Sequence, residues 1–130
     1  MASTLKINTL TGVTTAGSIA VTGEGNSTTT NLQQGLAKSW ITFKSASTFI
    51  ERDSFNVSTL TDSDAGYGTV TMTSVMSSIY HTVHSTSNDE NAHAGSGSHT
   101  TANYQLFSKN SSAALTDADG QYGTVFGDLA

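Results

Sequence analysis

The chain has 130 residues, of which 35% are apolar and 12% charged. Its 19 Ser and 22 Thr indicate a β-rich protein with many uncharged polar residues, and the low apolar share indicates a thin core. A net charge of −5 with five scattered basic residues argues against nucleic-acid binding, and without Cys there are no disulfides. No apolar run approaches a membrane span, and the first residues lack the pattern of a signal peptide. We therefore expect one domain, or a small domain with an arm, that shares its stability with copies of itself.

Residues 1–36 predict an arm. Short apolar alternations at 3–10 and 18–22 are typical of strands, with a turn at 12–17 between them and a flexible polar linker at 23–30 after them. The apolar residues are too few to form a core, yet their alternation would serve no purpose in a disordered tail. We expect an arm that a neighbouring subunit orders, with a disordered tail as the alternative.

Residues 31–39 are the only segment that predicts a helix. Asn31 is a good N-cap, and Leu32 and Leu36 lie one turn apart. Gly35 lowers the helix propensity, so we expect one or two turns at most.

Residues 37–130 predict a domain made of strands. Phe55 and Val57 are expected to share one face, as are Val70 and Met72. The polar stretch 86–101 is too long for an ordinary connection, which indicates a disordered or functional loop. Strands are expected at 40–43, 54–60, 67–73, 79–85, 103–108, 113–115 and 122–129. Their spacing of about ten residues predicts an all-β fold, a small antiparallel β-sandwich of the jelly-roll-like kind.

One sequence pattern occurs twice in this domain. LTDSDAGYGTV (60–70) and LTDADGQYGTV (115–125) match at eight of eleven positions. We interpret them as two hairpins with the same turn, in which Asp binds nearby backbone N–H groups and Gly supplies a positive φ.

The same turns also suggest a calcium loop as an alternative. They hold the pairs Asp62, Asp64 and Asp117, Asp119. A twelve-residue EF-hand loop ends in a bidentate Glu, whereas these loops would end at Thr73 and Asp128. We therefore favour plain turn chemistry.

The four histidines do not predict a metal site. His81 and His84 lie three apart on an expected strand and so leave opposite faces, whereas His93 and His99 lie in the polar stretch and could reach a neighbour or a symmetry axis. We expect no metal and no cofactor.

No catalytic motif is present, and we expect no enzyme. Glu51 and Asp53, or Asp89 and Glu90, could supply paired carboxylates for glycan hydrolysis, but such residues are more often a solvated strand edge. Arg52, the only Arg, is expected in a structural ion pair or an inter-subunit contact. The sequons at Asn26, Asn56 and Asn110 matter only in a secreted eukaryotic protein.

Several motifs resemble a family of small virion appendage proteins of tailed, mostly marine, bacteriophages. The specific ones are AKSWITF (37–43) and RDSFNVS (52–58). Four further segments are also similar: LTD (60–62), YGTV (67–70), the end VFGDLA (125–130) and the start STLKINTL (3–10). Together the motifs cover about a third of the chain. The His-rich stretch 84–101 and the second repeat copy depart from the pattern.

The resemblance implies a structural or receptor-contacting virion protein, with no catalytic residue to carry over. It implies a homotrimer on the virion in which the arm 1–36 docks onto major capsid or tail proteins, or onto a sibling, and the sandwich 37–130 projects. Capsid decoration or a short head fibre is favoured slightly over a tail-fibre tip because the chain is short.

The alternative is a glycan-binding module for host attachment. Its site would combine Tyr80, the stretch 86–101 and the Asp turns.

Overall fold

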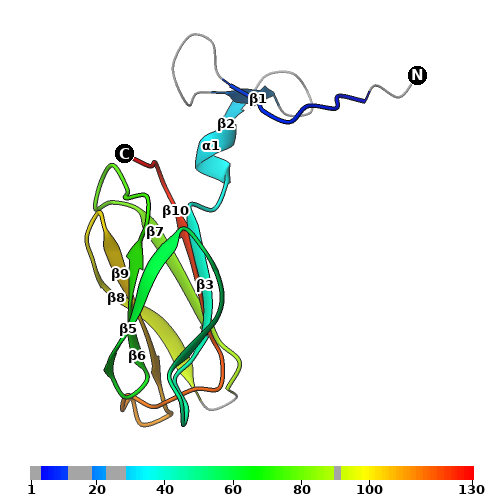
Figure 1. Cartoon of the computed structure of the whole chain (residues 1–130). Coiled ribbons are helices and arrows are strands. Elements are labelled where there is room, and N and C mark those ends of the chain that lie inside the picture. The colour runs from blue at the N-terminus through cyan, green and yellow to red at the C-terminus, as the bar shows by residue number, and fades with distance from the viewer. Residues whose placement is uncertain (1–3, 12–18, 23–28, 90–91) are drawn as a thin grey trace. The chain divides into compact units, whose positions relative to one another are not determined.

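The computed structural model describes residues 4–11, 19–22, 29–89 and 92–130. Contacts divide the chain into two compact units, Met1–Leu36 and Ala37–Ala130 (Figure 1). Within the described residues, no helix is long and apolar enough to cross a membrane.

The first unit holds a small antiparallel ribbon followed by one helical turn. Strand β1 (Ala20–Thr22) pairs with β2 (Thr29–Asn31), and α1 (Leu32–Gly35) follows directly. Asn31 caps the helix, as expected: its Oδ1 accepts hydrogen bonds from the backbone N–H groups of Gln33 and Gln34, at 2.8 and 3.3 Å.

Two predictions for this unit need correction. Residues 4–11 are not a strand, and Leu5 is 78% exposed, because no strand among the described residues pairs with this segment. Thr29 and Thr30, expected in a linker, pair in β2 because their branched side chains suit a strand. The predicted turn at 12–17 and most of the linker lie outside the described residues.

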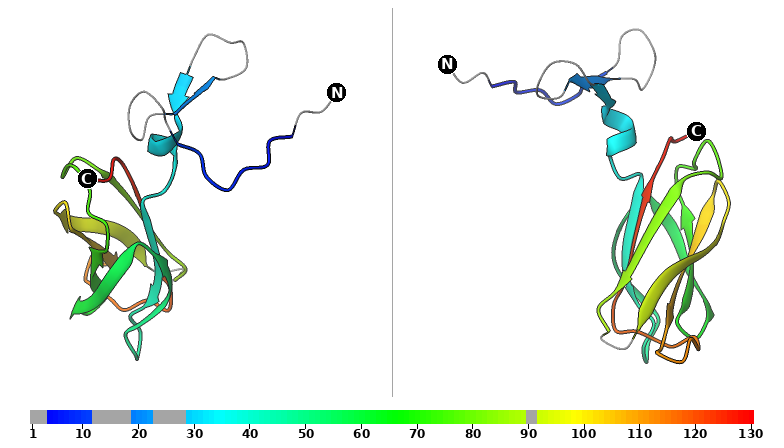
Figure 2. Two further views of the ribbon diagram at one scale, coloured as in Figure 1. Left: turned by 45° about the horizontal axis from the view of Figure 1, so that its top comes forward. Right: turned by 180° about the vertical axis from the view of Figure 1, so that it is seen from behind.

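The second unit is a sandwich of two four-stranded antiparallel sheets, which confirms the predicted fold class (Figures 1 and 2). In sheet I the order is β4-β3-β10-β7, and in sheet II it is β5-β6-β9-β8. Sheet I consists of β3 (Ser39–Lys44), β4 (Ile50–Phe55), β7 (Thr82–Ser87) and β10 (Gln121–Phe126). Sheet II consists of β5 (Val57–Asp64), β6 (Tyr67–Met72), β8 (His93–His99) and β9 (Asn103–Lys109).

A small apolar core lies between the sheets. It comes mainly from the central strands β3, β6, β9 and β10, in which buried positions alternate with half-buried or exposed ones. The buried cluster consists of Ile41, Phe43, Val70, Met72, Met76, Tyr104, Leu106 and Val125. Eight side chains make a thin core for a domain of this length, as the composition indicates.

Because every strand pairing is antiparallel, the connections gather at two ends of the sandwich. The turn end holds residues 45–49, 65–66, 88–89, 92 and 110–120. The terminal end holds residues 37–38, 56, 73–81, 100–102 and 127–130. Figure 1 shows the C-terminus at the end where β3 begins.

The strand predicted at 54–60 is two strands that belong to different sheets. Asn56, with a φ of 57°, separates β4 from β5, so Phe55 and Val57 do not share a face. Asn tolerates this left-handed conformation, and its side chain binds the surrounding backbone. Its Nδ2 donates to Lys38 O (2.8 Å) and Ser74 O (3.0 Å), and its Oδ1 accepts from Ser74 N (2.7 Å).

The predicted long loop at 86–101 is wrong, because residues 86–87 end β7 and residues 93–99 form β8 at the edge of sheet II. Gly95 lies against the Phe107 ring of β9, and Gly97 lies against the Tyr67 hydroxyl and Gln105, so side chains from β9 and β6 cover this segment. A Cβ on Gly95 would lie 2.5 Å from the Phe107 ring.

Other boundaries also differ, and the strand predicted at 122–129 is β10, which ends at Phe126. The strand predicted at 79–85 begins only at Thr82, and residues 79–81 are part of the connection at the terminal end. Residues 113–115 are not a strand, and Leu115 makes a single bridge to Lys109. The first repeat copy turns only at residues 65–66, since both flanking strands run closer to the turn than predicted.

Candidate functional site

The two repeat copies meet at the turn end. The first forms the β5–β6 hairpin, as predicted, but the second is not a hairpin: it leads from β9 in sheet II to β10 in sheet I. Gly66 N donates to Asp117 Oδ1 (2.6 Å), and Gly66 O accepts from Ser108 N (2.9 Å) and Gln121 Nε2 (3.3 Å). In the repeat alignment Gln121 is the counterpart of Gly66, so the copies differ where they touch.

A buried polar network continues from this contact into the core. Gln121 Nε2 also reaches Ser45 Oγ at 2.9 Å and Ser108 Oγ at 3.3 Å, and Ser45 Oγ accepts from Ala118 N at 2.9 Å. Buried polar groups are stable when they are hydrogen-bonded. The repeat therefore serves to join the two sheets.

The acidic residues of the turn end hold backbone and basic groups. Asp64 Oδ1 accepts from Ala65 N at 2.8 Å, which is the turn chemistry that the sequence predicts. Asp119 forms ion pairs with Lys44 (2.8 Å) and Arg52 (3.3 Å). The Lys44 ammonium first, and then the Arg52 guanidinium, hold the pKa of Asp119 below its usual value. Arg52 is thus in an ion pair within the domain.

Two of the carboxylates weighed for glycan hydrolysis, Glu51 and Asp53, accept hydrogen bonds from the same serine, Ser54. Both are exposed on the edge strand β4. Asp89 lies at the turn end, and Glu90, like Asn26, falls outside the described residues. Within the described residues, no three His, Asp or Glu side chains form a group that could hold a metal ion.

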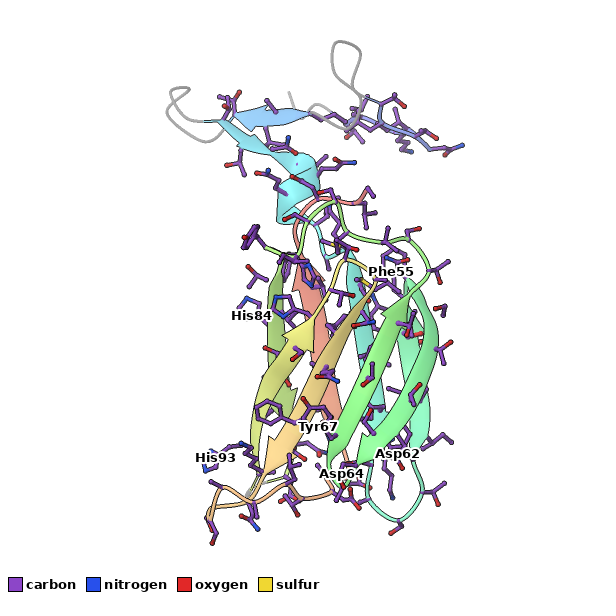
Figure 3. The ribbon with its side chains drawn as sticks, turned by 90° about the vertical axis from the view of Figure 1, so that its left-hand side faces the viewer. Phe55, Asp62, Asp64, Tyr67, His84 and His93 are labelled. Atoms are coloured by element: carbon purple, nitrogen blue, oxygen red, sulfur yellow. The ribbon has the colours of Figure 1, made fainter. Side chains whose placement is uncertain are left out.

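The outer face of sheet II carries a pair of stacked aromatic rings. Tyr67 and Phe107 are partners across β6 and β9, with centroids 5.9 Å apart and planes 9° from parallel. Gly95 and Gly97 of β8 lie under them and leave room for the rings. Figure 3 shows Tyr67 on the face turned to the viewer, in the half near the turn end.

Polar side chains surround these rings. Tyr67 Oη donates to Gln105 Oε1 at 2.9 Å, Gln105 Nε2 donates to Thr69 Oγ1 at 3.3 Å, and Lys109 Nζ lies 5.0 Å from the Phe107 centroid. We call Tyr67, Phe107, Gln105, Thr69 and Lys109 the aromatic platform. Half-buried ring faces beside amide, hydroxyl and ammonium groups form a surface on which a sugar ring can stack and be hydrogen-bonded.

The structure does not assemble the glycan site that the sequence predicts. Tyr80 is 90% exposed at the terminal end, whereas Asp62 and Asp64 lie near the turn end, as Figure 3 shows. The stretch 86–101 contributes β8, whose outer face adjoins the platform. Sequence reasoning missed Tyr67 and Phe107, although both occupy the outward positions of their alternating strands.

The terminal end exposes several large apolar side chains. Two backbone hydrogen bonds, from Ser77 N to Asp128 O and from Ala130 N to Val75 O, form the Met76–Leu129 bridge and hold loop 73–81 against the C-terminal segment. We call the exposed apolar residues here the apolar rim; they are Phe55, Val75, Ile79, Tyr80 and Leu129. An exposed apolar cluster of this kind favours association with another protein surface.

The four histidines considered in the sequence analysis lie in different environments. His84 packs edge-on against Phe126, with centroids 6.0 Å apart, and His93 is exposed near the turn end. His81 and His99 lie side by side at the terminal end.

Comparisons of the chain with protein-family models, with curated proteins and with solved structures give no match.

Proposed function

We propose that this protein is a non-enzymatic structural protein of a tailed-phage virion, displayed on the particle surface as capsid decoration or a short head fibre. The observation that carries the proposal is where the two most specific motifs of the phage-protein resemblance lie in the fold. AKSWITF supplies most of β3, and RDSFNVS spans the end of β4, the crossover at Asn56 and the start of β5. Trp40 and Phe55 are partners across β3 and β4, so both motifs build one structural unit.

The thin core and the apolar rim support association with copies of the protein. Tyr80 is 90% and Phe55 53% exposed, which leaves apolar surface in contact with water. Covering the rim in a homotrimer would remove this surface from water, at about 25 cal/mol per Å² of apolar area buried.

Removal of residues 1–36 tests the attachment role of the arm. Full-length protein and the 37–130 fragment are mixed with particles that lack the protein. The full-length chain should bind the particles, whereas the fragment should stay in solution although its circular dichroism spectrum shows the same β fold. Equal decoration by the fragment would refute the proposed role of the arm.

Copy number separates the two virion positions. A decoration protein is present in many copies per particle, whereas a tail-fibre tip is present in a few. Gel densitometry of purified particles against the major capsid protein measures this ratio, and a low ratio would overturn decoration.

A second candidate function, a tail-fibre tip or glycan-binding module that recognises the host, is supported by the aromatic platform. Host-cell binding by the recombinant protein, and its ability to block infection, test this function. Phe107→Ala should abolish binding because it removes half of the stacked pair, whereas Tyr122→Ala, which removes an exposed ring of sheet I outside the apolar rim, should leave it unchanged. An unaffected Phe107→Ala variant would exclude the platform as the binding site.

A further inference from the structure

The two sheets approach each other at one side through β7 and β8, and this seam ends in a histidine pair. β7 is an edge strand of sheet I and β8 an edge strand of sheet II, and they contact each other. His81 directly precedes β7, and His99 is the last residue of β8. Their ring centroids lie 4.8 Å apart, with 54° between the ring planes.

Backbone carbonyls select the same tautomer in both rings. His81 Nδ1 lies 3.0 Å from Ser78 O, and His99 Nδ1 lies 3.4 Å from Gly97 O. A carbonyl oxygen only accepts hydrogen bonds, so each Nδ1 carries a hydrogen, and in the neutral form of the ring Nε2 keeps a lone pair. Metal-binding imidazoles in proteins have this arrangement, in which the second ring N–H is donated to a carbonyl or carboxylate.

One of these lone pairs is buried without a partner. His81 is 7% exposed, and its Nε2 has no hydrogen bond within the described part of the chain. A buried acceptor that lacks a donor costs free energy, so such a group in a folded protein calls for an explanation. His99, by contrast, is exposed, so its ring can adjust beside His81 without disturbing the core.

We infer that His81 and His99 form a two-imidazole binding site for a late first-row divalent ion of the Zn²⁺ and Cu²⁺ class, with water in the remaining coordination positions. Metal–nitrogen bonds of about 2 Å place two imidazoles on one tetrahedral ion with centroids about 5 Å apart. The observed 4.8 Å fits this arrangement. Two imidazoles without a carboxylate suit these ions better than Ca²⁺ or Mg²⁺.

The site is not evident from the sequence, which predicts no metal. The sequence predicts that His81 and His84 leave opposite faces of one strand and that His99 lies in a loop. Only the fold brings the start of β7 and the end of β8 together.

Calorimetric titration of the tag-free, metal-free full-length chain with Zn²⁺ tests the inference. One ion should bind per chain, and His99→Gln should lower the affinity about tenfold or more. His93→Gln is the matched control: it lies at the other end of β8 and should bind Zn²⁺ like the original protein. Because His99 is exposed, the His99→Gln variant should fold normally.

Two further readouts identify the ligands. Zn²⁺ should raise the Tm of the original chain and of His93→Gln, but not that of His99→Gln. The ring ¹⁵N resonances of His81 and His99 should shift at Nε2, whereas those of His84 should not. Absence of Zn²⁺ binding, an equal loss in His93→Gln, or one ion per several chains would each overturn the intrachain site.

Discussion

Replacing Gly66 by Ala tests whether the contact between the two repeat copies holds the turn end together. Gly66 has a φ of 64°, and a Cβ there would overlap the carbonyl of Thr116 and lie 3.0 Å from Ser108 O. The left-handed conformation costs a residue with a Cβ about 1–2 kcal/mol. Displacing the backbone also breaks the hydrogen bonds from Gly66 N to Asp117 and from Ser108 N to Gly66 O, at about 1 kcal/mol each.

We therefore expect Gly66→Ala to lower the free energy of unfolding by about 3–4 kcal/mol, measured by urea denaturation followed by circular dichroism. Gly120→Ala is the control, because the atoms nearest to its Cβ would belong to the side chain of Asn88, at 2.8 Å, and that exposed side chain can move. It should cost about 1 kcal/mol or less. A loss of less than 1 kcal/mol in Gly66→Ala would refute the reasoning. If that variant does not fold, Asp117→Ala should still lose about 1 kcal/mol, and Asp117→Asn, which keeps the acceptor, should lose little.

Two further predictions follow from titratable groups. Burial raises the pKa of Tyr104 to about 12, so the unfolded chain loses this proton at a lower pH than the folded protein does. The free energy of unfolding should therefore fall by up to about 3 kcal/mol as the pH rises from 10 to 12. Tyr104→Phe should lack this loss in urea titrations across that range, and an identical loss in both proteins would contradict the assignment. For Asp119, NMR titration should give a pKa below the usual value, which Lys44→Met should raise by more than Arg52→Lys does. High salt should weaken the shift because Asp119 is solvent-exposed, and a salt-independent shift would rule out the ion pairs as its cause.

The central strands could be predicted from the sequence because each buries one face. β6 and β9 alternate strictly, with Val70 and Met72 buried in one and Tyr104 and Leu106 in the other. A period of two is the signal that sequence reasoning detects best.

The edge strands were harder to predict for two different reasons. The alternation runs unbroken through Phe55 and Val57, and nothing in it shows that Asn56 adopts a positive φ and sends the chain to the other sheet. In β8 the signal is absent, because Phe107 and Tyr67 cover Gly95 and Gly97 and replace the side chains that a strand pattern requires.

The candidate sites depend on pairings between distant segments. The aromatic platform joins β6 to β9, and the histidine pair joins edge strands of different sheets. Spacing along the chain identifies sites on one element, such as the Asp64 turn. It carries no information about which residues meet once the strands are paired.

The position of β3 has a mechanical consequence for a protein held at one end. The domain begins at the terminal end, and β3, its first strand, lies between β4 and β10 with antiparallel pairing on both sides. A force that pulls residue 37 away from the opposite end acts along β3, so the backbone hydrogen bonds on both sides resist shear together. An edge strand in the same place would be held on one side only. In the proposed virion role, this arrangement would help the domain to stay folded while drag or contact pulls on residues 1–36.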